Sequence, residues 1–257
     1  MVLEIRNISK NFGGISALTD VSFTINEGEI FGLIGPNGAG KTTMFNIITN
    51  MYAPSGGDII FRGETITGIN PHKITHKGIC RTFQNIKLFQ QMSVLENVMV
   101  GRHSRSSSGV LSSVLRIPSQ KREEEEMKKK AEELLDLVGL APHAHMIAEN
   151  LSYGQQRRLE IARALASDPK LLLLDEPAAG MNEKETDSLY DLIKEVQKRE
   201  ITVLIIEHDM PLVMKLCDRI TVLNFGKKLA QGTPDEIQNN DSVVEAYLGT
   251  EEEDILA

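Results

Sequence analysis

The sequence lacks any apolar run long enough to cross a membrane. Its longest runs, at residues 171–174 and 201–206, are strand-sized, whereas a membrane helix needs roughly 20 apolar residues. A signal peptide is also missing, because Glu4 and Arg6 interrupt the apolar stretch that such a peptide requires. We therefore expect a cytoplasmic protein that contacts a membrane through a partner.

Cysteine and positive charge are scarce as well. Cys80 and Cys217, the two cysteines, match no paired metal-binding spacing, and we interpret both as reduced core residues. The 36 acidic residues outnumber the 28 basic ones, which gives a net charge of −8. Such a surface repels phosphate backbones, so nucleic acid is not an expected partner.

The 257 residues predict one large domain that can be built in two lobes. Short β-rich segments alternate with helical ones at both ends of the chain, which is typical of a largely parallel sheet covered by helices. We predict strands at residues 2–6, 21–25, 29–34 and 79–83, and a helix at residues 41–50.

The middle of the chain is predicted to be helical. It contains a capping box at residues 93–96, a serine-rich loop at residues 104–113 and a charged helix at residues 121–138. From Leu171 the alternation of strands and helices resumes, with caps at residues 182–185 and 233–236, and the chain ends in an acidic tail at residues 251–257. We predict a core lobe at residues 1–84 and 168–257 and a helical subdomain at about residues 85–167.

A glycine-rich segment between a predicted strand and a predicted helix matches the phosphate-loop pattern G-x-x-x-x-G-K-[ST]. Glycines let backbone N–H groups close around phosphate oxygens, and the helix start adds its positive dipole end. We expect Lys41 to hold the β- and γ-phosphates of a nucleotide and Thr42 to coordinate Mg²⁺. The candidate nucleotide-binding residues here are Gly35, Pro36, Asn37, Gly38, Ala39, Gly40, Lys41, Thr42 and Thr43.

Two carboxylates end the apolar run that starts at Leu171. Asp175 suits the coordination shell of Mg²⁺, and Glu176 suits a general base for the attacking water. An apolar strand that ends in Asp-Glu can equally be a structural surface turn. Together with the phosphate loop, however, the pair predicts a catalytic site.

A third motif, Leu151-Ser152-Tyr153-Gly154-Gln155, begins a helical segment and resembles the LSGGQ signature of ABC ATPases. Physically it is a second anion-binding helix start in a chain with one phosphate loop. The resemblance implies a head-to-tail dimer, in which these five residues contact the ATP that is held by a second ATPase subunit.

The resemblance extends over essentially the whole chain. It implies that Phe12 stacks on adenine, that Gln84 is the Q-loop glutamine near the nucleotide and Mg²⁺, and that His208 is the switch histidine, catalytic with Glu176. Taken singly, Phe12 equally suits a core aromatic. Tyr153 and residues 179–182 depart from the usual signature and D-loop, from which we expect altered communication across the dimer.

Several segments are similar to those of the ATP-binding subunits of branched-chain amino-acid importers: residues 81–85, 104–113, 176–180, 207–210 and 247–249. The fold implied is α/β, a P-loop NTPase core with a mixed, largely parallel sheet, an antiparallel β subdomain and a helical signature subdomain. The implied partners are an integral membrane permease docked near Gln84 and the helical subdomain, and indirectly a substrate-binding protein, at the inner face of the membrane.

Three other functions remain open from the sequence. An ABC ATPase for lipid or lipopolysaccharide export can also end in Tyr-Leu-Gly. A non-transport ABC protein acting on ribosomes or DNA would usually carry two cassettes or a long coiled coil. A P-loop kinase would have no use for the signature. The sequence also leaves open whether the cassette pairs with itself or with a paralogue.

Overall fold

The computed structural model describes residues 1–102 and 118–253. The predicted serine-rich loop at residues 104–113 and the end of the acidic tail, residues 254–257, lie outside the described residues. Among the helices in the described ranges, none is both long and apolar enough to cross a membrane.

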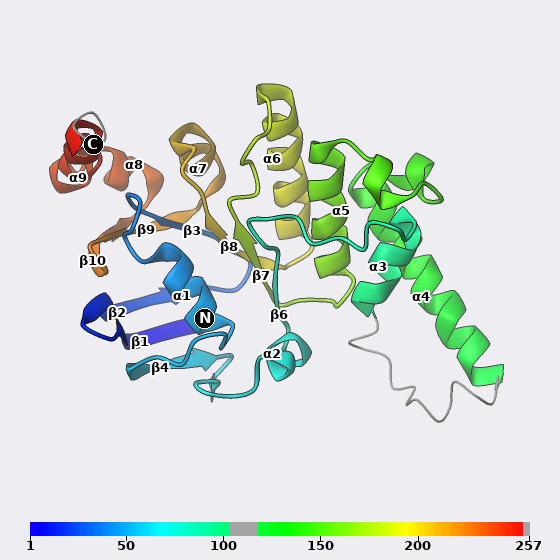
Figure 1. The fold of residues 1–257 in the computed structure, drawn as a ribbon, viewed down its shortest axis with the longest axis horizontal. Coiled ribbons are helices and arrows are strands. Elements are labelled where there is room, and N and C mark those ends of the chain that lie inside the picture. The colour runs from blue at the N-terminus through cyan, green and yellow to red at the C-terminus, as the bar shows by residue number, and fades with distance from the viewer. Residues whose placement is uncertain (103–117, 254–257) are drawn as a thin grey trace.

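A mixed six-stranded sheet runs through the centre of the molecule (Figure 1). Strands β9 to β6 pair in parallel along this order, and the edge strand β10 pairs antiparallel to β9. The predicted largely parallel sheet is confirmed. In spatial order the strands are β10 (Lys227–Gly232), β9 (Arg219–Asn224), β3 (Ile30–Ile34), β8 (Thr202–Ile206), β7 (Leu171–Asp175) and β6 (Ile79–Arg81).

The apolar runs of the central strands follow from burial on both faces of this sheet. In β7, Leu171 and Leu173 pack into one hydrophobic cluster, whereas Leu172 and Leu174 pack into a second one on the other face. A strand that is buried on both sides has no polar face, so its sequence shows no alternation.

An antiparallel four-stranded sheet lies beside the central one, as predicted. Helix α1 (Lys41–Ile48) packs between the two sheets, and Met44 and Phe45 belong to the same cluster as buried residues of both. The four strands are, in spatial order, β2 (Ile15–Ile25), β1 (Leu3–Phe12), β4 (Gly56–Phe61) and β5 (Glu64–Thr65).

The first two strands are longer than the sequence predicted. A two-residue Gly-Gly turn joins β1 to β2, and Phe12 pairs with Ile15 across it. The outer halves of both strands are largely exposed, including the apolar residues Phe12 and Ile15, so no regular hydrophobic pattern reveals them. Smaller errors concern the ends of α1, β3, β6 and α4, which the structure moves by one to three residues.

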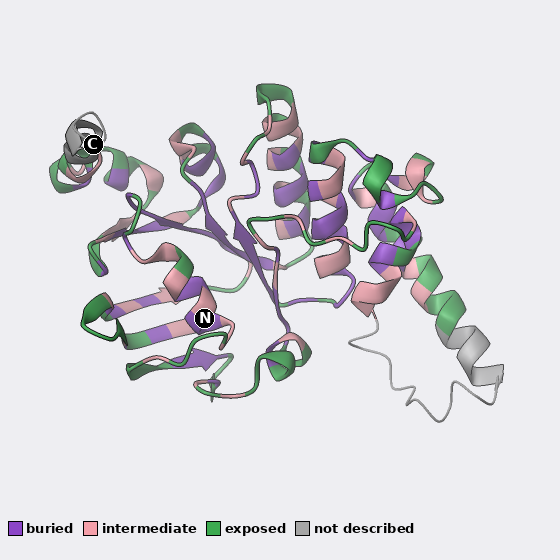
Figure 2. Ribbon diagram, viewed as in Figure 1, coloured by how far each residue is buried: buried purple, intermediate pink, exposed green. Residues whose placement is uncertain are grey.

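Helices α5, α6 and α7 cover the face of the central sheet opposite α1, whereas Ile74 of α2 packs in the same cluster as α1. The predicted caps are confirmed: Ser93 bonds with Glu96, Asn182 with Glu185, and Thr233 with Glu236. Figure 2 shows burial concentrated on the central strands and on the sides of the helices that face them. The helices are α2 (Pro71–Lys77), α3 (Val94–Arg102), α4 (Pro118–Leu137), η3 (Ala141–His143), η4 (Ala148–Asn150), α5 (Tyr153–Leu165), α6 (Glu183–Lys198), α7 (Met210–Leu216), α8 (Pro234–Gln238) and α9 (Asp241–Glu253).

Truncation of a central strand residue tests this core. Leu173 is 0% exposed, so Leu173→Ala is expected to lower the free energy of unfolding by about 3 kcal/mol, through lost burial and the cavity left behind. Ile15→Ala, at a residue 74% exposed, is the control. Urea titration followed by circular dichroism measures both, and equal midpoints for the two variants would contradict the packing described.

Candidate functional site

The predicted site residues follow three strands that are neighbours in the sheet. The glycine-rich loop follows β3, His208 lies two residues after β8, and Glu176 directly follows β7. Since β3, β8 and β7 are parallel, their carboxyl ends meet at one edge, where open α/β sheets bind ligands. The fold therefore brings the three motifs together.

The glycine-rich loop has the backbone geometry of a tight phosphate-binding turn. Gly35 has φ 148° and Gly40, at the start of α1, has φ 101°. A β-carbon on Gly35 would lie 2.1 Å from the carbonyl oxygen of Leu223, so no other residue fits without moving the backbone. The loop thus leads into the positive end of α1.

Lys41 is held against the carbonyl groups of its own loop. Its ammonium donates to the backbone oxygen of Gly35 at 2.6 Å and to that of Pro36 at 2.9 Å. Burial lowers the pKa of Lys41, while the negative charges of Glu176 and Asp175 act in the opposite direction. The cation, the loop and both carboxylates therefore interact within one site.

Glu176 is linked to Gln84. The side-chain amide of Gln84 donates to Oε2 of Glu176 at 2.8 Å. Glu176 has φ 46°, which is uncommon for a residue other than glycine, and its N–H donates to the carbonyl of Ile206 at 2.9 Å. Backbone strain of this kind is concentrated at functional sites.

Asp175 is paired with Arg81, a residue that the sequence analysis did not include in the site. Arg81 donates to Oδ2 of Asp175 at 2.6 Å and to the side-chain oxygen of Asn46 at 2.7 Å. Side-chain exposures of 9% and 4% make this a buried pair. The contact depends on pairing of β6 with β7, which no local pattern reveals.

His208 is exposed, and its backbone is fixed by the buried Glu207. The Glu207 carboxylate accepts from the N–H groups of Ala178 at 2.6 Å and His208 at 3.1 Å. Burial raises the pKa of Glu207. Glu207, also missed in the sequence, thus ties the segment after β7 to the segment after β8.

Tyr247 connects helix α9 to the phosphate loop through a hydrogen bond with the backbone of Gly35. Burial raises the pKa of Tyr247 to about 12, so its hydroxyl is neutral at physiological pH. In the sequence, Tyr247 is recognisable only as part of the family ending at residues 247–249.

The signature residues form the start of α5. Ser152 is its N-cap, in a capping box with Gln155. A β-carbon on Gly154 would lie 2.6 Å from Oε1 of Glu185, and one on Gly180 would lie 3.4 Å from the Tyr153 ring. The two departures from the family pattern, Tyr153 and the segment around Gly180, therefore lie next to one another within the chain.

The start of α5 and the phosphate loop belong to different faces of the sheet. Buried residues of α1 pack in one hydrophobic cluster and those of α5 in the other, and Figure 1 shows β7 and β8 between the two helices.

Phe12 is 43% exposed, with its ring 5.4 Å from that of Tyr52 in an edge contact. It is not the core aromatic that the sequence left open.

The residues present fit a nucleotide phosphate with Mg²⁺. A helix start, a loop with backbone donors and the Lys41 ammonium suit phosphate, while Thr42, Gln84 and Asp175 offer the oxygen ligands that Mg²⁺ prefers. The pairing with Arg81 engages one of the Asp175 oxygens.

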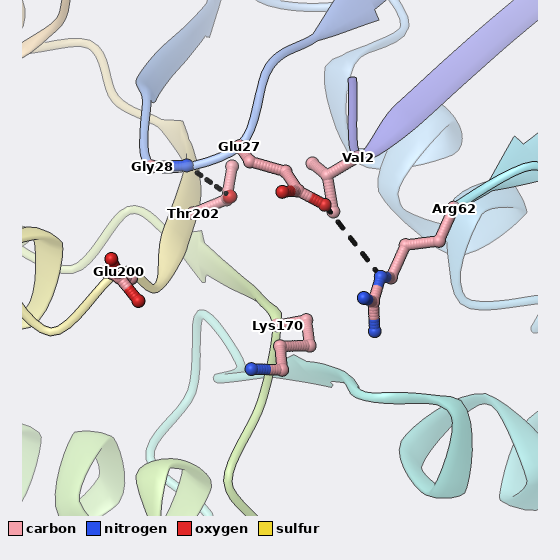
Figure 3. A pocket seen from close by; sticks show the side chains of 7 residues that line it. All are labelled: Val2, Glu27, Gly28, Arg62, Lys170, Glu200 and Thr202. Atoms are coloured by element: carbon pink, nitrogen blue, oxygen red, sulfur yellow. Dashed lines mark hydrogen bonds and ion pairs between the residues drawn. The ribbon is translucent and has the colours of Figure 1, made fainter.

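A cavity of about 310 Å³ lies at the opposite edge of the sheet (Figure 3). None of the predicted site residues lines it. Its walls carry charges of both signs, and Arg62 forms an ion pair with Glu27 at 3.9 Å. The lining residues are Val2, Glu27, Gly28, Arg62, Lys170, Glu200 and Thr202.

Comparison with known proteins decides the family. The profile of the ABC transporter family matches residues 18–179, more than half of the chain. The chain belongs to the ABC transporter family. A second profile, the branched-chain amino acid ATP-binding cassette transporter, matches residues 227–253, the part of this ABC protein that contains Tyr247.

Curated ABC relatives cover almost the entire chain. LivG of Salmonella typhimurium, a high-affinity branched-chain amino acid transport ATP-binding protein, is 47% identical over 96% of this chain and 98% of its own. BraF of Pseudomonas aeruginosa, described in the same terms, is 46% identical over the same shares. LptB of Haemophilus influenzae, of a lipopolysaccharide export system, is 34% identical over 96% and 97%.

Solved ABC cassettes share the fold. The ADP conformation of MJ1267, an ATP-binding cassette of an ABC transporter, superposes with a TM-score of 0.85 at 35% identity, over 96% of this chain and 98% of that one. A dimeric post-hydrolysis state of the cassette MJ0796, bound to ADP and Pi, has a TM-score of 0.76 at 28% identity, over 90% and 98%. The predicted ABC ATPase fold is confirmed.

Proposed function

We propose that this chain is the ATP-binding and ATP-hydrolysing subunit of an importer for branched-chain amino acids. The observation that carries the proposal is the meeting of Lys41, Gln84 and Glu176 at the carboxyl edge of the sheet, in a chain close to LivG and BraF over nearly its full length.

Each residue at this edge has a role in the proposed reaction. Lys41 and the backbone of the glycine-rich loop bind the phosphates, and Phe12 stacks on the adenine ring. Glu176 takes a proton from the attacking water. Gln84 and His208 position the reacting groups next to Glu176. Mg²⁺, held by Thr42, Asp175 and Gln84, would neutralise charge on the phosphates.

The proposed working form is a head-to-tail dimer. One chain offers two anion-binding helix starts on different faces of its sheet, and only one of them carries a phosphate loop. In the dimer, Ser152 and Gly154 of one chain close on the ATP bound by its partner. The dimeric MJ0796 cassette supports dimerisation.

The proposed membrane partner is a permease that docks at the cytoplasmic face, beside the segment that carries Gln84. A groove of about 340 Å³ there opens between α2, α3 and α5. Its lining includes Phe89, which is 46% exposed, and Arg163. In this proposal, substrate selection belongs to the permease and to a binding protein, as the family resemblance implies.

Lipid or lipopolysaccharide export is the second candidate, supported by the likeness to LptB. Two observations favour amino acids instead. Identity to LivG and BraF is higher, and residues 227–253 match a branched-chain amino acid profile.

Transport by a strain that lacks the chain tests the assignment. Leucine, isoleucine and valine uptake is expected to be lost on deletion, to return with the wild-type gene and to stay lost with Lys41→Ala, because the phosphate-binding ammonium is missing. Lysine uptake is the control. Normal branched-chain uptake with a defect in lipopolysaccharide export would favour the second candidate.

A further inference from the structure

Helix α5 holds the backbone of the segment between β6 and α3. Arg157 donates to the carbonyl oxygens of Phe83, at 2.6 Å, and of Gln84. Glu160 accepts from the N–H groups of Phe83 at 3.3 Å and Lys87 at 3.4 Å. Figure 1 shows this irregular segment crossing α5 on its way to α3. Two side chains of one helix thus satisfy four backbone groups of the segment.

Arg157 and Glu160 form a buried ion pair, 3.2 Å apart, with side-chain exposures of 2% each. Burial raises the pKa of Glu160, and Nε of Arg157 has no hydrogen-bond partner. A well-packed apolar pair is often as stable as such a buried pair. The charges therefore contribute a specific geometry, namely the hydrogen bonds that hold the backbone of residues 83–87, which we call the grip.

The hydrogen bonds from Arg157 to this backbone are connected to the proposed general base, Glu176. The carbonyl of Gln84 is held by Arg157, while its side chain donates to Glu176 at 2.8 Å. At its other end, Arg157 donates to the hydroxyl of Tyr153 at 3.3 Å and lies 5.6 Å from the ring. A continuous set of contacts thus runs from the exposed start of α5 to Glu176.

We propose that Arg157 and Glu160 are positioning residues that fix Gln84 against Glu176, and that Tyr153 links them to the ligand bound at the start of α5. The proposal rests on the proposed function of the site. It also assigns a role to Tyr153. Phosphate that the second subunit presents at the start of α5 influences, through Tyr153 and Arg157, hydrolysis at the Glu176 of the chain that carries this α5.

Arg157→Lys tests the grip, because lysine keeps the charge beside Glu160 but loses the planar fork that reaches two carbonyls. We expect kcat for ATP to fall about tenfold with KM within about twofold, the signature of a displaced catalytic group. Arg158→Lys, one position along the same helix, is the matched control; Arg158 donates to Val138 at 3.5 Å and should leave kcat unchanged.

The Gln84→Ala background separates positioning from general stability. If Arg157 acts through Gln84, Arg157→Lys should lower kcat there by less than about twofold, since coupled residues are not additive. The same tenfold loss in both backgrounds, or wild-type kcat for Arg157→Lys, overturns the proposal.

Hydrogen exchange supplies a readout that needs no activity. The amides of Phe83 and Lys87 are expected to exchange faster in Arg157→Lys than in Arg158→Lys, at equal melting temperatures. Unchanged protection contradicts the grip. A different result would contradict the proposed function. If Glu176→Gln hydrolyses ATP at the wild-type rate, the site assignment is wrong, whereas an Arg157→Lys variant with unchanged kcat contradicts only the present inference.

Discussion

Glu176→Gln is expected to leave ATP binding intact and to slow hydrolysis by about 10²-fold or more, the usual scale for removing a general base. Glutamine is isosteric, so it can keep a hydrogen bond with Gln84, which now donates to Glu176 at 2.8 Å. It cannot take a proton from water. Steady-state ATP turnover and binding of a fluorescent nucleotide measure the two effects.

The same variant is expected to accumulate as an ATP-bound dimer on size exclusion, whereas the wild type without nucleotide runs mainly as a monomer. Glu200→Gln is a matched control, because Glu200 also has a positive φ, 60°, but lines the cavity at the opposite edge of the sheet. Undiminished hydrolysis by Glu176→Gln would mean that another residue positions the water.

The central strands could be predicted from the sequence because burial on both faces gives them uninterrupted apolar runs. The order strand, glycine loop, helix around Lys41 is equally local, and the structure confirms it. The outer half of the first hairpin was missed because most of its residues are exposed and form no regular apolar face, and only pairing across the Gly-Gly turn makes them a strand. The division into a core lobe and a helical subdomain stays a prediction.

The supporting residues of the site escaped prediction for a different reason. Arg81 and Asp175 are 94 positions apart and meet only because β6 pairs with β7. Arg157 looks like one more charged residue on a helix, yet its side chain is 2% exposed. Sequence patterns indicate the groups proposed to perform chemistry, whereas the groups that orient them depend on contacts between distant segments.

Mixed dimers of Lys41→Ala and Ser152→Arg are expected to regain ATP turnover that neither variant has alone. The reason is geometric, because α1 and α5 pack on different faces of the sheet and a composite site takes Lys41 from one chain and Ser152 from the other. In the mixed dimer one site carries both defects and the other carries neither. Each homodimer has no intact site.

The measurement uses two affinity tags, so that dimers containing both variants are isolated before ATP turnover is compared with both parents and with the wild-type homodimer. About half of wild-type turnover is expected if the two sites act independently. Turnover no higher than that of either parent would require strict cooperativity of the two sites or a signature that acts within its own chain. An active Ser152→Arg homodimer is a stronger contradiction: Ser152 caps α5, and a bulky side chain there should prevent this helix start from closing on phosphate, so its tolerance would remove the signature from the catalytic site.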